Sequence, residues 1–107
     1  MVEIAIVNVV RQYLAVLPNV GIHASRAVLF GSFARDEADQ DSDIDLVVVA
    51  PEFDAGRDHD TIKRLWETTI LADVRIEPIP CGEQEWENGN GRPILEIARR
   101  EGVVIEA

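Results

Sequence analysis

The run Asp43-Ile44-Asp45-Leu46-Val47-Val48-Val49 constrains the fold more than any other part of this 107-residue chain. From Leu46 onward it is continuously apolar and rich in β-branched valine, which is typical of a strand buried on both faces. Such a strand needs a neighbouring strand beside it and a covering layer on each face. The run therefore predicts the centre of a β-sheet with helices packed against it.

The flanking segments alternate between helical and extended patterns. Apolar residues recur at three- and four-residue steps near the start of the chain, which predicts an amphipathic helix over residues 2–17. Further strands are expected over residues 26–30, 74–79 and 103–105, and further helices over residues 33–37, 60–71, 83–87 and 93–101. The expected fold class is α/β (α+β), as one domain over residues 1–107.

Some side chains have an expected position within these elements. Trp66 falls on the apolar side of its helix and is expected in the core. Asp73, Arg75 and Glu77 alternate with apolar residues and are expected on the polar face of the strand over residues 74–79. The prolines at 78 and 80 should either make this an edge strand or end it.

The net charge of −10 is concentrated in one part of the chain. Residues 36–60 hold ten of the twenty acidic residues and a single basic residue, Arg57. Such a field repels a nucleic-acid backbone, so no nucleic-acid partner is expected. No apolar run approaches the roughly 20 residues that a membrane span needs, so no membrane partner is expected either. The lone Cys81 cannot form an internal disulfide, which favours the cytoplasm.

Asp43 and Asp45 form a candidate metal site. Two residues apart on a strand, their carboxylates project from the same face about 7 Å apart. Both can then reach one divalent cation, or two cations about 3.5–4 Å apart, and hard oxygen ligands suit magnesium or manganese. A solvent-facing acidic strand is the alternative interpretation. An EF-hand loop over residues 41–52 is disfavoured, because Leu46 stands where that loop needs glycine.

Gly31-Ser32 forms a candidate phosphate site. Glycine permits a tight turn with close backbone approach, and the helix expected after it would present N–H groups to an anion. The Ser32 hydroxyl can donate to a phosphate, or it can cap that helix. Taken alone, the dipeptide is equally compatible with an ordinary strand-to-helix turn. Beside the aspartate pair, it predicts a phosphate site and a metal site at the same end of the sheet.

These two motifs together resemble a known family. Gly31-Ser32, ten residues and then Asp43-x-Asp45, embedded in Gly-Ser-Phe-Ala-Arg and Asp-Ser-Asp-Ile-Asp-Leu-Val-Val-Val, resemble the minimal nucleotidyltransferases of the DNA polymerase β-like superfamily. The similarity is strong across residues 27–49 and weaker toward the end. It implies the polymerase β-like fold, a small mixed β-sheet flanked by helices.

The resemblance also implies a set of site residues. Two metal ions, Mg²⁺ or Mn²⁺, would lie on Asp43 and Asp45, and ATP, as the nucleoside triphosphate donor, would be held at Gly31 and Ser32. Arg35 is a further candidate for the triphosphate, with an exposed helix arginine as the alternative.

The superfamily adds a third carboxylate from a neighbouring strand, which binds the metal that activates the attacking hydroxyl. Glu77 is the preferred candidate because it lies mid-strand, and Asp73, at the strand's start, is the alternative. The family commonly has glycine where this chain has Asp36, which leaves the geometry of the acidic loop open.

The activity implied by the resemblance is magnesium-dependent transfer of a nucleoside monophosphate, AMP from ATP, to a hydroxyl. Similar stand-alone domains are often encoded beside a HEPN-domain protein and act as its antitoxin by adenylylating it. A hydroxyl on such a partner protein is therefore the expected acceptor, and both a homodimer and a hetero-oligomer are compatible with this role. The alternatives are a module that neutralises a helical partner by contact, and a subunit of an antibiotic-type, small-molecule adenylyltransferase.

Overall fold

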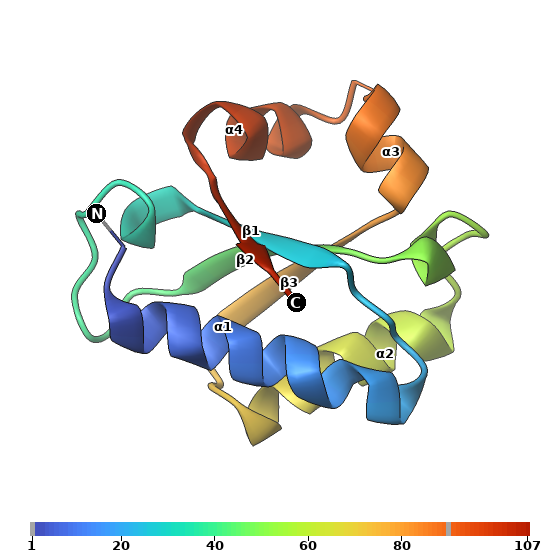
Figure 1. Ribbon diagram of the computed structural model, residues 1–107, viewed down its shortest axis with the longest axis horizontal. Coiled ribbons are helices and arrows are strands. Elements are labelled where there is room, and N and C mark those ends of the chain that lie inside the picture. Colours follow the sequence, from blue (N-terminus) through green and yellow to red (C-terminus); the bar gives the residue numbers. More distant parts are fainter. Residues whose placement is uncertain (1, 90) are drawn as a thin grey trace.

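The predicted valine-rich strand lies inside a four-stranded sheet in the computed structural model, which describes residues 2–89 and 91–107. The sheet order is β3-β2-β1-β4 (Figure 1). Strand β1 pairs antiparallel with β2 and β4, and β2 pairs parallel with β3. The strands are β1 (Arg26–Phe30), β2 (Ile44–Val49), β3 (Ile76–Cys81) and β4 (Val103–Glu106). The expected mixed sheet flanked by helices is confirmed.

Helices cover both faces of this sheet. The long helix α1 (Ile4–Val16) and α2 (His59–Glu67) lie on one face, and α3 (Glu83–Asn88) and α4 (Pro93–Glu101) lie on the other (Figure 1). Because side chains alternate along a strand, β2 supplies both layers of the core. Ile44 and Leu46 pack toward α1, while Val47 and Val49 pack with Leu95 of α4. This double burial explains why β2 is apolar at nearly every position.

Short 3₁₀ turns connect several elements: η1 (Leu17–Val20), η2 (Gly31–Phe33), η3 (Pro51–Phe53) and η4 (Thr68–Leu71). The helix predicted over residues 33–37 is instead the turn η2, which begins one residue before Ser32, so the prediction that Ser32 caps a helix is wrong. The helix predicted to end at residue 71 gives way to η4 at Thr68. There the hydroxyl of Thr68 donates to the Arg64 carbonyl at 2.7 Å, a bond that tightens a helix end.

Three predicted side-chain positions are also wrong. Trp66 is 47% exposed, because Leu65 and Thr69 occupy the buried stripe of α2 and its 3₁₀ extension. Asp73 and Arg75 lie before β3 rather than on its polar face. The Asp73 carboxylate accepts a hydrogen bond from the Arg75 backbone N–H at 2.9 Å, a local turn that delays the strand until Ile76.

The edge position of β3 is confirmed by the sheet order. Its two prolines lie where they cost no sheet hydrogen bond. The N–H of Ile44 donates to the Arg75 carbonyl and that of Ala50 donates to the Cys81 carbonyl. Backbone groups alternate in direction along a strand, so these two hydrogen bonds show that residues 75, 77, 79 and 81 face β2. The backbone nitrogens of residues 76, 78 and 80 therefore point away from β2, toward the open edge. Prolines at two of these positions therefore prevent another chain from extending the sheet here.

No helix within residues 2–89 and 91–107 is both long and apolar enough to cross a membrane.

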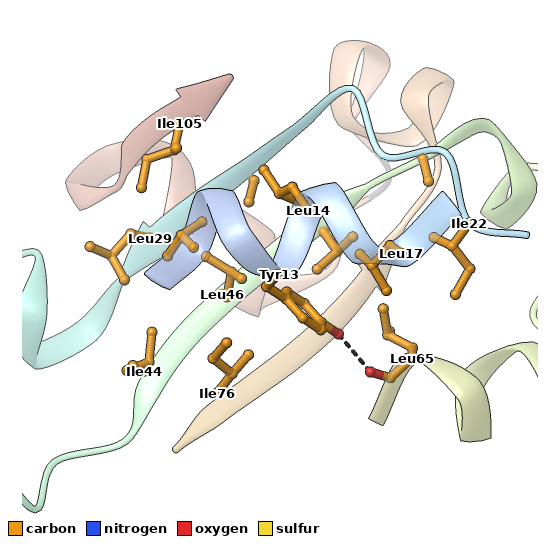
Figure 2. Close-up of a cluster of buried hydrophobic side chains, with 14 of the residues drawn as sticks. Tyr13, Leu14, Leu17, Ile22, Leu29, Ile44, Leu46, Leu65, Ile76 and Ile105 are labelled. Atoms are coloured by element: carbon orange, nitrogen blue, oxygen red, sulfur yellow. Dashed lines mark hydrogen bonds between the residues drawn. The ribbon is translucent and has the colours of Figure 1, made fainter. Parts of the chain in front are cut away.

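Tyr13 joins the two helices that lie on the same face. Its hydroxyl donates to the Leu65 carbonyl at 2.6 Å inside the core (Figure 2), and burial raises the pKa of Tyr13.

We expect Tyr13→Phe to lower the free energy of unfolding by about 1 kcal/mol, because the buried carbonyl loses its donor while the ring remains. Denaturant titration measures this, and unchanged stability would show that the bond contributes nothing net.

Candidate active site

One end of the sheet gathers the residues that the sequence singled out. In the parallel pair β2–β3, Asp45 lies directly beside Glu77. In the antiparallel pair β1–β2, Asp45 lies opposite Phe30, the last residue of β1. Gly31 follows Phe30 at once and therefore lies at the same end, where β1 stops and β2 and β3 begin. Asp43 immediately precedes β2.

Gly31 and Asp45 are packed in direct contact. A Cβ atom on residue 31 would lie 2.2 Å from Oδ2 of Asp45, so a larger residue would force the carboxylate to shift. The φ of Gly31 is +74°, a left-handed conformation that favours glycine. The backbone therefore favours glycine, and the present position of the Asp45 carboxylate depends on it. The sequence indicated a glycine that lets a phosphate approach the backbone closely. The structure shows that this glycine also leaves room for the Asp45 carboxylate.

The three carboxylates at this end repel one another. Burial raises the pKa of Asp45, and the charge of Asp43 raises it further, while Arg35 acts in the opposite direction. Burial likewise raises the pKa of Glu77, with added contributions from the charges of Asp43 and Asp45 and from a hydrogen bond with Asp43. Ionisation of Asp45 and Glu77 is therefore less favourable than that of free carboxyl groups, and a divalent cation would relieve the repulsion.

The chemistry of the donor set fits such a cation, since carboxylate oxygens are the ligands that magnesium and manganese prefer. Within the described part of the chain, however, no three His, Cys, Asp or Glu side chains are already placed as metal ligands. Asp43, Asp45 and Glu77 therefore supply the right atoms in one neighbourhood, and a bound ion would have to draw them together.

Asp73, the alternative third carboxylate, is held elsewhere. Arg75 Nη2 lies 2.7 Å from its Oδ2, and hydrogen bonding from the Arg75 side chain lowers the pKa of Asp73. The Arg75 guanidinium also lies over the ring of Phe33, 5.7 Å from its centroid, and donates to the Gln40 carbonyl. Because Asp73 already has a cationic partner and Glu77 lies beside Asp45, the geometry favours Glu77.

The candidate phosphate-binding groups lie next to the carboxylates. Two of them contact the Glu101 side chain, which the sequence did not indicate as part of the site. The Gly31 N–H donates to Oε1 of Glu101 at 3.2 Å, and Arg35 Nη1 donates to the same oxygen at 3.0 Å. Ser32 lies within η2, partly buried. Glu101 ends α4, seventy residues from Gly31 in the chain. Nothing local in the sequence links these two residues.

Asp36 takes the conformation that a glycine would take. Its φ is +62°, in the left-handed region, where aspartate is among the better-tolerated residues. The backbone at Asp36 therefore has the conformation that the glycine common in similar sequences would also adopt. The substitution alters the side chain at this position without preventing the turn.

The remaining reactive side chains lie apart from this cluster. Burial raises the pKa of Cys81 to about 12, so its thiol stays protonated, as expected of a passive residue. His23 pairs with Glu52 through Nδ1 at 2.9 Å. Trp86 packs against the core beneath α4 with the Arg99 guanidinium 4.6 Å from its ring centroid, so it covers the sheet rather than standing free as an anchor.

The comparisons with known proteins show a family and a similar fold. Residues 16–92 match the nucleotidyltransferase domain family, and the chain therefore belongs to that family. The fold is similar to the crystal structure of a proposed nucleotidyltransferase from Sulfolobus solfataricus, with a TM-score of 0.64 and 15% sequence identity. The match covers 97% of this chain and 87% of that one. No curated protein matches the sequence.

The contact between Gly31 and Asp45 can be tested through stability. We expect Gly31→Ala to lower the free energy of unfolding by about 2–3 kcal/mol, from backbone strain of about 1–2 kcal/mol plus displacement of the Asp45 carboxylate. Gly21→Ala is the matched control, because Gly21 has φ +84° and a Cβ there would meet nothing within 4 Å. Equal losses in the two variants would show that strain alone matters.

The repulsion among the carboxylates predicts a pH dependence. A native pKa raised above the unfolded value means that the folded state holds the proton longer, so stability falls as pH rises through the native pKa. Without metal, Asp45→Asn should therefore be more stable than wild type near pH 7.5, and the difference should vanish in acid, where both states are protonated. Thermal denaturation from about pH 2.5, well below the ordinary pKa of an aspartate, to about pH 8 measures it.

Magnesium or manganese should stabilise wild type at pH 7.5 and have little effect on Asp45→Asn. The control Glu87→Gln removes an exposed charge on α3 and should behave as wild type in both experiments. If the substitutions Asp45→Asn and Glu87→Gln raised the stability by the same amount, the prediction would be contradicted, because the gain would then reflect net charge alone.

Proposed function

We propose that this chain is a magnesium-dependent nucleotidyltransferase that moves AMP from ATP to a hydroxyl on a partner protein. In this proposal the partner is a HEPN-domain protein, and the chain is the cytoplasmic antitoxin of that pair, as a minimal nucleotidyltransferase. The observation that carries the chemistry is the convergence of Asp43, Asp45 and Glu77 beside the Gly31 N–H and Arg35. Membership of the nucleotidyltransferase domain family supports nucleotidyl transfer in general.

The proposed site contains one group of residues for the metal ion and another for the phosphates. Asp43 and Asp45, with Glu77, would hold the magnesium, which supplies positive charge against the phosphates. The Gly31 N–H, the Ser32 hydroxyl and the Arg35 guanidinium would bind the β- and γ-phosphates and align the α-phosphate.

Transfer itself is an in-line displacement. The acceptor oxygen forms a bond to the α-phosphorus as the bond to pyrophosphate breaks, and pyrophosphate departs. Glu77 would help to generate the nucleophile by binding the metal ion that lowers the pKa of the acceptor hydroxyl, whose proton is then lost to solvent.

A second candidate function is neutralisation of a helical partner by contact alone, and one surface favours it. Trp66, Ile70, Leu71 and Val74 are 47%, 72%, 62% and 75% exposed along α2 and the turns that follow it. Trp66 and Ile62 line a groove of about 450 Å³ rimmed by Lys63. Exposed apolar side chains grouped in this way are typical of a protein–protein contact, such as a groove for an amphipathic helix.

Mass spectrometry distinguishes the two functions. The purified chain is incubated with ATP, Mg²⁺ and the protein encoded beside it, and that protein is examined for the mass of added AMP. We expect transfer by wild type, and none by Asp43→Asn combined with Asp45→Asn, because the metal ligands are lost. Trp66→Ala should weaken partner binding while leaving the metal-dependent stabilisation intact.

Either result can refute the proposal. If wild type adds no AMP yet binds and silences the partner, contact alone is the function. If the double aspartate variant still transfers AMP at the wild-type rate, the site has been assigned to the wrong residues.

A further inference from the structure

The Glu101 carboxylate occupies the place that an anionic ligand would take. A single oxygen, Oε1, accepts hydrogen bonds from the Gly31 N–H at 3.2 Å and from Arg35 Nη1 at 3.0 Å. These are two of the three donors that the proposed function assigns to the triphosphate. A backbone N–H and a guanidinium converging on one oxygen bind carboxylate and phosphate alike. Glu101 therefore contacts the donors as a phosphate oxygen would.

The backbone holds Glu101 in this position. The next residue, Gly102, packs so tightly against β1 that a Cβ there would lie 2.5 Å from Val28 Cγ1 and 3.2 Å from the Leu29 carbonyl. Its N–H donates to the Ala98 carbonyl at 2.8 Å, closing the last turn of α4. The end of α4 is thus fixed against the end of β1, two residues before Gly31. The contact is part of the fold rather than a chance meeting of two surface side chains.

Arg35 connects this internal anion to the carboxylates of the candidate metal site. Its guanidinium donates to Glu101, and its charge also lowers the pKa of Asp45. Glu101 adds a further negative charge at these donors, next to the carboxylates of the candidate metal site. An incoming triphosphate would meet this charge and would have to take both donors from it.

We propose that Glu101 is an internal competitor for the triphosphate position and that it sets which ligands enter the site. This inference rests on the proposed function. A weak monoanion gains too little from two donors to displace a tethered carboxylate. A triphosphate that is complexed with magnesium gains further contacts at Asp43 and Asp45 and can displace it. Glu101 therefore lowers affinity for every phosphate ligand and reserves the site for those that bring a metal ion.

The test measures binding rather than catalysis. Inorganic tripolyphosphate, and separately ATP, is titrated with Mg²⁺ into wild type, Glu101→Gln and Glu101→Ala by isothermal titration calorimetry. Both substitutions should tighten binding roughly fivefold, the upper range for a partly exposed ion pair. Glutamine keeps an acceptor oxygen and removes only the charge, so it also guards against a loss of structure in the alanine variant.

Glu96→Gln is the matched control. Glu96 lies on the same helix and pairs with Arg99 at 2.6 Å, and within the described residues it forms no hydrogen bond or ion pair with Gly31 or Arg35. The substitution removes one negative charge from α4 and should leave affinity within about twofold of wild type, because an exposed charge that contacts neither phosphate donor has little effect at physiological salt. The Gly31 amide resonance should shift as tripolyphosphate is added, at lower concentrations in Glu101→Gln than in wild type.

Different failures overturn different statements. Unchanged or weaker binding by the Glu101 variants, while wild type binds tripolyphosphate, overturns the competitor role and leaves the nucleotide site standing. A Gly31 amide that does not respond to bound tripolyphosphate also overturns it. If wild type and every variant bind neither tripolyphosphate nor ATP, the proposed function falls together with this inference.

Discussion

Phe30, Asp45 and Glu77 lie side by side across β1, β2 and β3, and the register that aligns them is the constraint on which the site depends. Side chains alternate along a strand, so a slip of one residue in β2 would turn Asp45 into the core beneath α1. The burial of Ile44 and Leu46 opposes that slip. The same apolar pattern that stabilises the sheet therefore positions the acidic side chains.

The residues of the candidate site lower the stability of the fold when no ligand is bound. Burial and mutual repulsion raise the pKa values of Asp45 and Glu77, and Gly31 adopts a left-handed backbone to make room for a carboxylate. The burial and the repulsion cost free energy in the protein alone, whereas the left-handed backbone costs little because residue 31 is glycine. Such costs are typical of sites built to bind a charged ligand, because the ligand removes the repulsion when it arrives.

The two faces of the sheet serve different purposes. The face covered by α1 and α2 holds the larger core, joined by Tyr13, and carries exposed apolar side chains on its outer surface. The other face holds a smaller core beneath α4, and the end of that helix brings Glu101 to Gly31. The proline-protected edge of β3 prevents sheet extension beside Glu77. Contacts with a partner and nucleotide chemistry thus have separate surfaces available to them.

The sequence by itself determined the local features. The valine run predicted the central strand, the 3.6-residue period predicted α1, and the spacing of Gly31-Ser32 from Asp43-x-Asp45 indicated a site at one end of the sheet. Each depends on residues near one another in the chain, where periodicity and turn chemistry act directly. Trp66 was misplaced because two apolar residues adjacent on a short helix cannot both face the core, and only packing decides which does.

The tertiary structure alone decided which distant residues meet. Pairing between β2 and β3 brought Glu77 to Asp45, and a local hydrogen bond removed Asp73 from that strand. Packing of Gly102 against β1 brought the Glu101 carboxylate to Gly31 and Arg35. No periodicity in a single sequence encodes a contact across seventy residues, because such contacts follow from how whole elements pack. The aspartate pair of the candidate metal site could therefore be predicted from the sequence, whereas the anion beside it could not.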